Sequence, residues 1–196
     1  MMERRYTGKR KTNETEIEIT LDIDGEGNGT IETGIGFFDH MLEQVAKHGL
    51  IDIELKAVGD LNVDFHHTVE DVGIVLGEAI KAATTDKKGI KRYSTIYTPM
   101  DEALSMISID ASGRPFIYFD VKYTGERVGS FEVELVEEFF RAVAMKAEIT
   151  LHINNLYGRN NHHIIESIFK AFGRAVREAY TIDDRIKGVM STKGIL

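Results

Sequence analysis

Two kinds of hydrophobic spacing follow each other in the first half of the chain. Single alternation of polar and apolar residues predicts half-buried strands, and apolar residues three or four positions apart predict helices. Glycine clusters mark the turns between them. The expected elements are a half-buried strand within residues 4–23, a glycine-rich turn at 25–29, a return strand from residue 30, a helix at 37–47, a strand at 51–55 and a helix at 66–84.

The same order of spacings begins again after a polar connector at residues 84–89. The second half predicts strands at 93–98, 104–110 and 116–121, a helix at 133–145, a strand at 149–153 and a final helix at 162–180. Two halves with one element order indicate an internal duplication.

Matching residues support the duplication. The motif His-His-x-x-Glu occurs at His66, His67 and Glu70 and returns at His162, His163 and Glu166, while Gly77 and Ala79 match Gly173 and Ala175. We therefore expect an α+β fold of two similar units, residues 1–84 and 85–196. Each would have an antiparallel or mixed sheet of about four strands, covered on one face by two helices. The strand order remains open.

Composition narrows the class of protein. Hydrophobic residues make up 42% and charged residues 29% of the 196 positions, as in globular proteins. No apolar run approaches the roughly 20 residues of a membrane span, and the basic N-terminus lacks the apolar segment of a secretory signal. These features favour a cytoplasmic protein. The net charge of −8 argues against nucleic-acid or membrane-surface binding.

The two histidine motifs suit metal ions. The chain has no cysteine, so any metal must be held by nitrogen and oxygen ligands. Neighbouring helical residues point about 100° apart, so His66 and His67 can serve two different metals, with Glu70 able to share a face with either. His162, His163 and Glu166 repeat this arrangement. The donor set suits zinc, manganese, iron, cobalt or nickel, and several such ligands with water favour six-coordinate manganese or iron.

Three further histidines have weaker signals. A lone histidine on a helix is usually a surface or satisfied core residue, whereas a duplicated pair with a carboxylate at helical spacing is harder to explain without a metal. His40 and His152 could each complete a metal sphere or be structural. His48 ends a helix before a glycine, where it can meet the helix dipole.

Five segments together resemble the imidazoleglycerol-phosphate dehydratase family. They run in the order of that family from about residue 4 to the C-terminus, and none departs from it at a motif position. The segments are GIGFFDHML at 34–42, DFHHTVED at 64–71, DASGRP at 110–115, NHHIIE at 161–166 and STKG at 191–194.

The resemblance implies a metal site, a substrate and an assembly. It implies two manganese ions per active site, a small phosphorylated imidazole as substrate, and sites between subunits of trimers that metal assembles into a 24-subunit shell, with no nucleic-acid or membrane partner. The implied metal ligands are His40, His66, His67, Glu70, His152, His162, His163 and Glu166.

The implied reaction explains the need for metal. Dehydration of imidazole glycerol phosphate to imidazole acetol phosphate removes a proton from a carbon with no neighbouring carbonyl, so the imidazole ring must accept the charge. Metal ions at the ring nitrogens would act as Lewis acids, and a base and an acid must move protons. The family pattern indicates Glu14 for this role, although Glu14, Glu16 and Glu18 look alike from spacing alone. Glu166 and Asp101 are further catalytic candidates.

Substrate binding needs cations for a phosphate dianion. A single lysine or arginine is normally a solvated surface charge, and a short terminal segment is normally frayed; only the resemblance selects these residues together. The expected substrate-binding residues are Glu14, His40, His48, His66, Glu70, Arg92, Arg114, Lys170, Ser191, Thr192 and Lys193. Ile74 stands where the second half has Lys170, so the halves have diverged.

Three other classes compete with this interpretation. A ferritin-type di-metal oxidase also uses glutamate and histidine, but it needs four long helices, and the alternating strands oppose that. A metal-nucleated structural shell explains the histidines but not Arg92, Arg114 and Lys170. A nucleic-acid-binding α+β module is disfavoured by the acidic charge and by the lack of an aromatic-basic motif.

Overall fold

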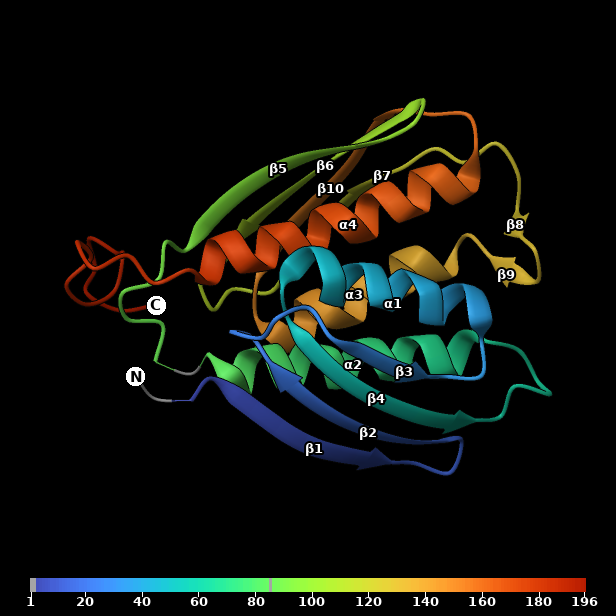
Figure 1. Ribbon diagram of the computed structural model, residues 1–196, viewed down its shortest axis with the longest axis horizontal. Coiled ribbons are helices and arrows are strands. Elements are labelled where there is room, and N and C mark those ends of the chain that lie inside the picture. The colour runs from blue at the N-terminus through green and yellow to red at the C-terminus, as the bar shows by residue number, and fades with distance from the viewer. Residues whose placement is uncertain (1–2, 85) are drawn as a thin grey trace.

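The computed structural model describes residues 3–84 and 86–196 (Figure 1). The first half contains β1 (Arg5–Lys11), β2 (Thr15–Asp22), β3 (Gly29–Glu32), α1 (Gly36–Gly49), β4 (Asp52–Gly59) and α2 (His66–Ala83). The second half contains β5 (Tyr93–Met100), β6 (Ala103–Asp110), β7 (Phe116–Asp120), β8 (Arg127–Val128), β9 (Phe131–Glu132), α3 (Leu135–Ala147), β10 (Thr150–Tyr157) and α4 (Asn161–Tyr180).

Each half forms one four-stranded mixed sheet, and the two sheets have the same topology. The strand orders are β1-β2-β4-β3 and β5-β6-β10-β7. In both sheets the last pair is parallel, β3 with β4 and β7 with β10, and the other pairs are antiparallel. The four helices lie between the two sheets, as Figure 1 shows. The expected α+β duplication is confirmed, with each sheet covered on one face by two helices.

The expected single strand within residues 4–23 is wrong in one respect, because the structure divides it into the hairpin β1–β2. Arg5 pairs with Asp22 and Lys11 with Glu16. The turn is held by Thr12, whose Oγ1 accepts the backbone N–H groups of Glu14 and Thr15 at 3.1 and 3.0 Å. This turn contains neither glycine nor proline, so the sequence offers no strong signal for it. The short strands β8 and β9 were not predicted either, although Gly129 lies in the turn between them.

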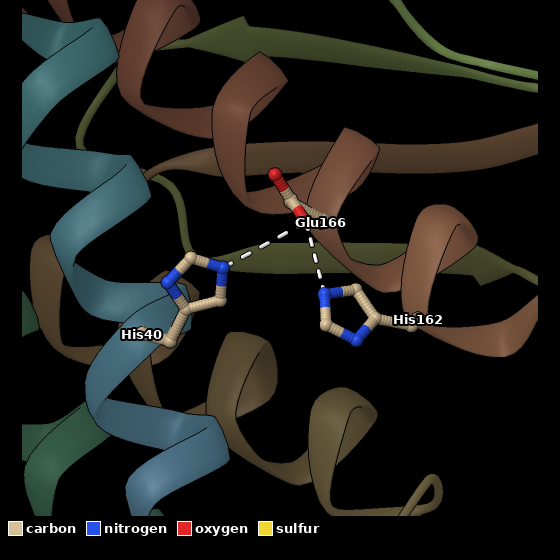
Figure 2. Close-up of side chains that lie close together, drawn as sticks. All are labelled: His40, His162 and Glu166. Carbon is tan, nitrogen blue, oxygen red and sulfur yellow. Dashed lines mark hydrogen bonds and ion pairs between the residues drawn. The ribbon is translucent and has the colours of Figure 1, made fainter.

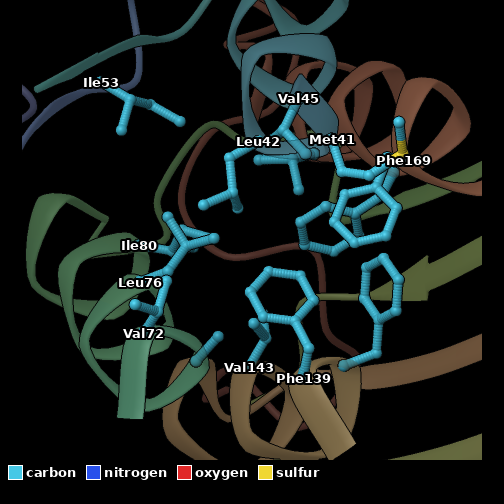
Figure 3. Close-up of a cluster of buried hydrophobic side chains, with 14 of the residues drawn as sticks. Met41, Leu42, Val45, Ile53, Val72, Leu76, Ile80, Phe139, Val143 and Phe169 are labelled. Carbon is cyan, nitrogen blue, oxygen red and sulfur yellow. The ribbon is translucent and has the colours of Figure 1, made fainter. Parts of the chain in front are cut away.

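The core lies where the helices meet each other and the inner faces of the sheets (Figure 3). In β2 the apolar residues at alternate positions are buried and the outward positions are polar, because successive side chains of a strand point to opposite faces. An aromatic cluster joins α3 to α4, with Phe139 and Phe169 stacked at 5.3 Å between ring centroids. Burial of this apolar surface is the main driving force for joining the halves.

Two matching glycines allow the helices to approach closely. A Cβ on Gly77 of α2 would lie 2.7 Å from the carbonyl oxygen of Val143 in α3. A Cβ on Gly173 of α4 would lie 2.4 Å from the carbonyl oxygen of Val45 in α1. Both contacts are closer than a real Cβ tolerates. The close packing of α2 on α3 and of α1 on α4 therefore requires a glycine at the contact. The repeat of Gly77 as Gly173 therefore reflects packing.

The boundary between the expected units falls at residue 85, outside the described residues, as do residues 1 and 2 of the first unit. The division at 84/85 stays a prediction. No helix in the described parts of the chain is both long and apolar enough to cross a membrane.

Candidate metal centre

The second histidine motif occupies the first turn of α4. Asn160 precedes the helix in an extended conformation, and its Oδ1 accepts the backbone N–H of His162 at 2.9 Å. This side-chain cap fixes where the helix begins. His162 and Glu166, four residues apart, consequently share one face, while His163 points elsewhere.

His40, His162 and Glu166 come together as a three-ligand group (Figure 2). His162 Nε2 lies 3.0 Å from Glu166 Oε2, and His40 Nε2, from α1, lies 3.8 Å from the same oxygen. The three ligand atoms lie within 4.8 Å of one another. Close packing of α1 on α4 through Gly173 brings a histidine from another helix to the motif.

The carboxylate of Glu166 is shared between this group and Lys170. Lys170 Nζ lies 2.7 Å from Glu166 Oε1, one helical turn along α4. Burial alone would raise the pKa of Glu166, but the hydrogen bond and charge of Lys170 outweigh it and lower that pKa. Glu166 is therefore an ionised carboxylate that presents Oε2 to the two histidines.

His163, the second histidine of this motif, is held by a different carboxylate. Its Nδ1 lies 2.7 Å from Oε2 of Glu102, the residue just before β6. That hydrogen bond raises the pKa of His163, and it is the largest cause lowering the pKa of Glu102 to about 2. Asp101, in the β5–β6 turn, lies 3.8 Å from the other nitrogen, Nε2. Nε2 of His163 thus faces the exposed end of the hairpin.

The first motif has a similar local arrangement at the start of α2. His66 Nε2 lies 3.9 Å from Glu70 Oε2. His67 Nδ1 lies 3.0 Å from Asp60 Oδ2, and this bond raises the pKa of His67. Glu14 Oε1 lies 3.9 Å from Nε2 of His67, so the expected proton-transfer residue stands beside the motif.

A single chain does not bring the two motifs together. Among residues 3–84 and 86–196, the group of His40, His162 and Glu166 is the one whose three ligand atoms lie close enough together, within 4.8 Å, to share a metal. Helices α1 and α3 end at equivalent left-handed residues, Leu50 and Glu148. Counted back from these ends, Glu138 of α3 occupies the position that His40 has in α1. Oε2 of Glu138 lies 3.8 Å from Nε of Arg141. The first motif therefore has no counterpart of His40, the α1 histidine that completes the group at the second motif.

His152 also lies apart from this group. It occupies the outer face of the second sheet, opposite Ser108 and Tyr118, because its neighbours Leu151 and Ile153 point into the core. Its ring lies 5.6 Å from that of Tyr118. Within one chain, His152 is positioned for a ligand only on that outer face.

Two of the expected phosphate-binding cations, Arg92 and Arg114, lie together at a second location. Arg92 donates two hydrogen bonds to Asp110, at 2.7 and 3.1 Å, and a third to the carbonyl oxygen of Met190 at 2.6 Å. Arg114 donates to Asp110 at 3.2 Å. The bond to Asp110 raises the pKa of Arg92. The contact with Met190 holds the C-terminal segment beside Arg92, and this segment carries Ser191, Thr192 and Lys193.

This cationic group and the metal-ligand group lie near opposite ends of α4. The backbone N–H of Arg92 donates to the carbonyl oxygen of Ala179, in the last turn of α4. His162 stands in the first turn. At a rise of 1.5 Å per residue, the two points are about 25 Å apart. One small ligand cannot span that distance.

Lys170 and His48 lie between these two ends. Partial burial and then the positive charges of Lys170 and Arg174 lower the pKa of His48, so His48 faces α4 and not only the end of its own helix. Lys170 also donates a weak hydrogen bond to Met100 Sδ at 3.5 Å. These residues are the part of the expected cationic set that lies nearest Glu166.

Sequence reasoning missed Asp60 and Glu102. Neither belongs to a periodic motif, since Asp60 lies in the loop after β4 and Glu102 in a hairpin turn. One available signal was positional, because Glu102 directly precedes its strand as Glu14 does in the first half. The contacts with the histidines themselves depend on the tertiary fold.

The donor set fits a metal ion. Two imidazoles and a carboxylate converge from α1 and α4, and they are the borderline ligands of manganese, iron or zinc. His67 and His163 each have Nδ1 engaged by a carboxylate, which leaves Nε2 as the nitrogen able to bind a metal.

Comparisons with known proteins agree with this chemistry. A family model described as imidazoleglycerol-phosphate dehydratase matches residues 33–176. The chain is 68% identical to the imidazoleglycerol-phosphate dehydratase of Alkaliphilus metalliredigens and 60% identical to that of Acetivibrio thermocellus, each over 100% of both chains. It is similar to the crystal structure of the Staphylococcus aureus enzyme, with a TM-score of 0.83, 42% identity and coverage of 91% of this chain and 99% of that one. A Pyrococcus furiosus structure gives a TM-score of 0.83, 36% identity and coverage of 96% and 100%.

Proposed function

From the membership of this chain in the imidazoleglycerol-phosphate dehydratase family, we propose that its two histidine motifs hold the metal ions of the reaction. The chain is a hydro-lyase of histidine biosynthesis, which converts imidazole glycerol phosphate into imidazole acetol phosphate. The family is metal-dependent, and the group of His40, His162 and Glu166 is the observation that carries the proposal.

Two manganese ions per site are proposed, held by the expected ligand set. When bound, they supply Lewis acidity to the imidazole ring of the substrate, which is the only part able to accept charge from the neighbouring carbon. His40 with His162 and Glu166 would hold one metal position from α1 and α4. His67 and His163 would offer Nε2, because carboxylates occupy their Nδ1 atoms.

Glu14 is the proposed proton-transfer residue. Its carboxylate lies beside Nε2 of His67 without reaching hydrogen-bond distance, and its side chain is 54% exposed. It is thus free to exchange a proton with a substrate at this position. The reaction needs a base for the carbon-bound proton and an acid for the departing hydroxyl. Glu166 is less suited to that exchange, since it bonds to His162 and Lys170.

The complete site is proposed to form between copies of the chain. The group of Arg92, Arg114 and the C-terminal segment lies about 25 Å along α4 from His162, so one chain cannot offer both to one substrate. His152 lies on the outer face of a sheet, and the first motif lies apart from the second. Both would therefore also need a neighbouring chain to reach the metal-ligand group. Assembly of trimers into a 24-subunit shell would supply the missing groups from neighbours.

In that arrangement the cations bind the phosphate. Asp110 holds the guanidinium groups of Arg92 and Arg114 in one place, and Ser191, Thr192 and Lys193 lie on the segment that Arg92 contacts. Lys170 would bring a further cation from the metal side. Ordered arginines can bind a phosphate with paired hydrogen bonds, which gives orientation as well as affinity.

The test is turnover of imidazole glycerol phosphate before and after removal of metal. We expect chelated protein to lose dehydration activity and to regain it with manganese. Protein that turns over substrate equally well without any metal would contradict the proposal. A metal-nucleated shell with no enzymatic role predicts metal-dependent assembly without dehydration, so measuring particle size in the same samples separates the two functions.

A further inference from the structure

The second histidine of each motif is bonded to a carboxylate, but the two carboxylates come from different parts of the fold. Glu102 Oε2 lies 2.7 Å from His163 Nδ1, and Asp60 Oδ2 lies 3.0 Å from His67 Nδ1. Glu102 precedes β6 in a hairpin turn, whereas Asp60 follows β4. Both halves therefore have a carboxylate at Nδ1 of the second histidine, but the carboxylate comes from a different element in each half.

Glu102 is anchored by the backbone around α4. Its Oε1 accepts the N–H groups of Arg159 and Asn160 at 3.1 and 2.8 Å, just before the helix begins. Its other oxygen accepts from His163. A carboxylate fixed by two backbone N–H groups can hold the imidazole in one orientation and one tautomer.

The counterpart of Glu102 in the first half is Glu14. The hairpins have matching registers, with Arg5 opposite Asp22 and Tyr93 opposite Asp110, and each glutamate directly precedes the second strand of its hairpin. Glu14 does not bond to Nδ1 of His67, because Asp60 occupies that position. The loop before α4 contains no acidic residue that could play the part of Asp60.

We infer that Asp60 and Glu102 are positioning residues, which accept the Nδ1–H of His67 and His163 and so direct each Nε2 toward a metal. The inference rests on the proposed metal-dependent function. It also assigns a reason for the different duties of the two hairpin glutamates. Because Asp60 orients the first-half histidine, Glu14 is released for proton transfer, whereas Glu102 is committed to orientation.

Asp60→Asn and Glu102→Gln test the inference through metal affinity. An amide can still accept through its oxygen but cannot offer a carboxylate to the imidazole N–H. We expect manganese affinity, measured by chelator competition, to fall about 10- to 100-fold in each variant, as for other outer carboxylates of metal-bound histidines. The melting temperature of the metal-free protein should change little, and the rise in melting temperature on adding manganese should shrink.

Two matched variants serve as controls. Asp64→Asn removes a neighbouring negative charge that bonds to the backbone N–H of His66 and to no imidazole, so manganese affinity should be kept. Glu14→Gln changes the register partner of Glu102, and it should lower turnover while leaving manganese affinity unchanged. Manganese affinity that falls in Glu102→Gln and is kept in Glu14→Gln would distinguish positioning from proton transfer.

Wild-type manganese affinity in both Asp60→Asn and Glu102→Gln would overturn the inference, even if wild-type protein is an active metalloenzyme. Should Glu102→Gln unfold the metal-free protein through its backbone bonds, Asp60→Asn alone decides, since the Asp60 side chain bonds only to His67 among the described residues. Wild-type protein that neither binds manganese nor dehydrates substrate would instead refute the proposed function.

Discussion

Adjacent histidines in each motif have different neighbours, because one helical step turns the side chain by about 100°. His162 faces Glu166 and His40 across the α1–α4 contact, while His163 faces Glu102 in a hairpin. The motif spacing predicted this separation of roles. It did not predict Asp60 and Glu102, whose contacts depend on how loops close over the helix starts.

Glu14→Gln tests the proton-transfer residue. The glutamine keeps the shape of the side chain but cannot take up a proton, so we expect turnover to fall by roughly 100-fold or more, the usual contribution of a positioned acid or base. Metal content should remain normal. The measurements are steady-state kinetics and metal analysis on the same preparation, and undiminished turnover would remove Glu14 from the mechanism.

At the scale of elements, the sequence predicted most helices and strands but not every turn or helix contact. Periodicity predicted all four helices and most strands, since burial of one face imposes it on the sequence. The division of residues 4–23 into β1 and β2 was not visible, because Thr12 makes the turn through its side chain without glycine or proline. The match of Gly77 with Gly173 pointed to duplication, but its cause is the close approach of neighbouring helices.

Gly173→Ala is expected to destabilise the fold and disturb the metal group. The added methyl would meet the backbone of Val45 at 2.4 Å, and overpacking of this kind typically costs about 1–3 kcal/mol. His40 lies on the displaced helix α1, so manganese affinity should also fall. Gly36→Ala is the control, because a Cβ there meets nothing within 4 Å. Urea unfolding with no difference between the two variants would contradict this role for Gly173.

Asp52→Asn tests a loop contact through its pH dependence. Asp52 Oδ1 accepts the N–H groups of Asn28 and Glu26 at 2.8 and 2.9 Å. The bond from Asn28 is the largest cause lowering the pKa of Asp52 below 3.8. A lowered folded-state pKa gives stability that is present above the unfolded value and lost as pH falls through the folded one.

We therefore expect wild-type protein to exceed Asp52→Asn in unfolding free energy by on the order of 1 kcal/mol at neutral pH. The difference should shrink as pH falls below about 4. Unfolding of metal-free protein by urea across this range measures it. A difference that grows on acidification would have the wrong sign for this contact.

For the whole molecule, the separation of the metal-ligand and cationic groups along α4 is the feature with the largest functional consequence. The sequence order of these residues gave no indication of it, since distance along the chain does not report distance in space. A site completed by a neighbour predicts that two different inactive variants can restore each other when they assemble together.

Co-assembly of His162→Ala with Arg92→Ala should recover part of the dehydration activity that neither has alone. One chain retains the metal-ligand group and the other retains Arg92, so some composite sites are intact. His162→Ala with His40→Ala should recover none, because both residues belong to a group formed within one chain. Absence of recovery in verified mixed assemblies of the first pair would contradict a shared site.

Metal analysis combined with a dehydration assay on His163→Ala beside wild type tests the central claim most directly. The duplicated motifs are proposed to hold the metal ions that the reaction requires, so the variant should lose bound metal and turnover together. A His163→Ala protein with full metal content and wild-type turnover would contradict the account.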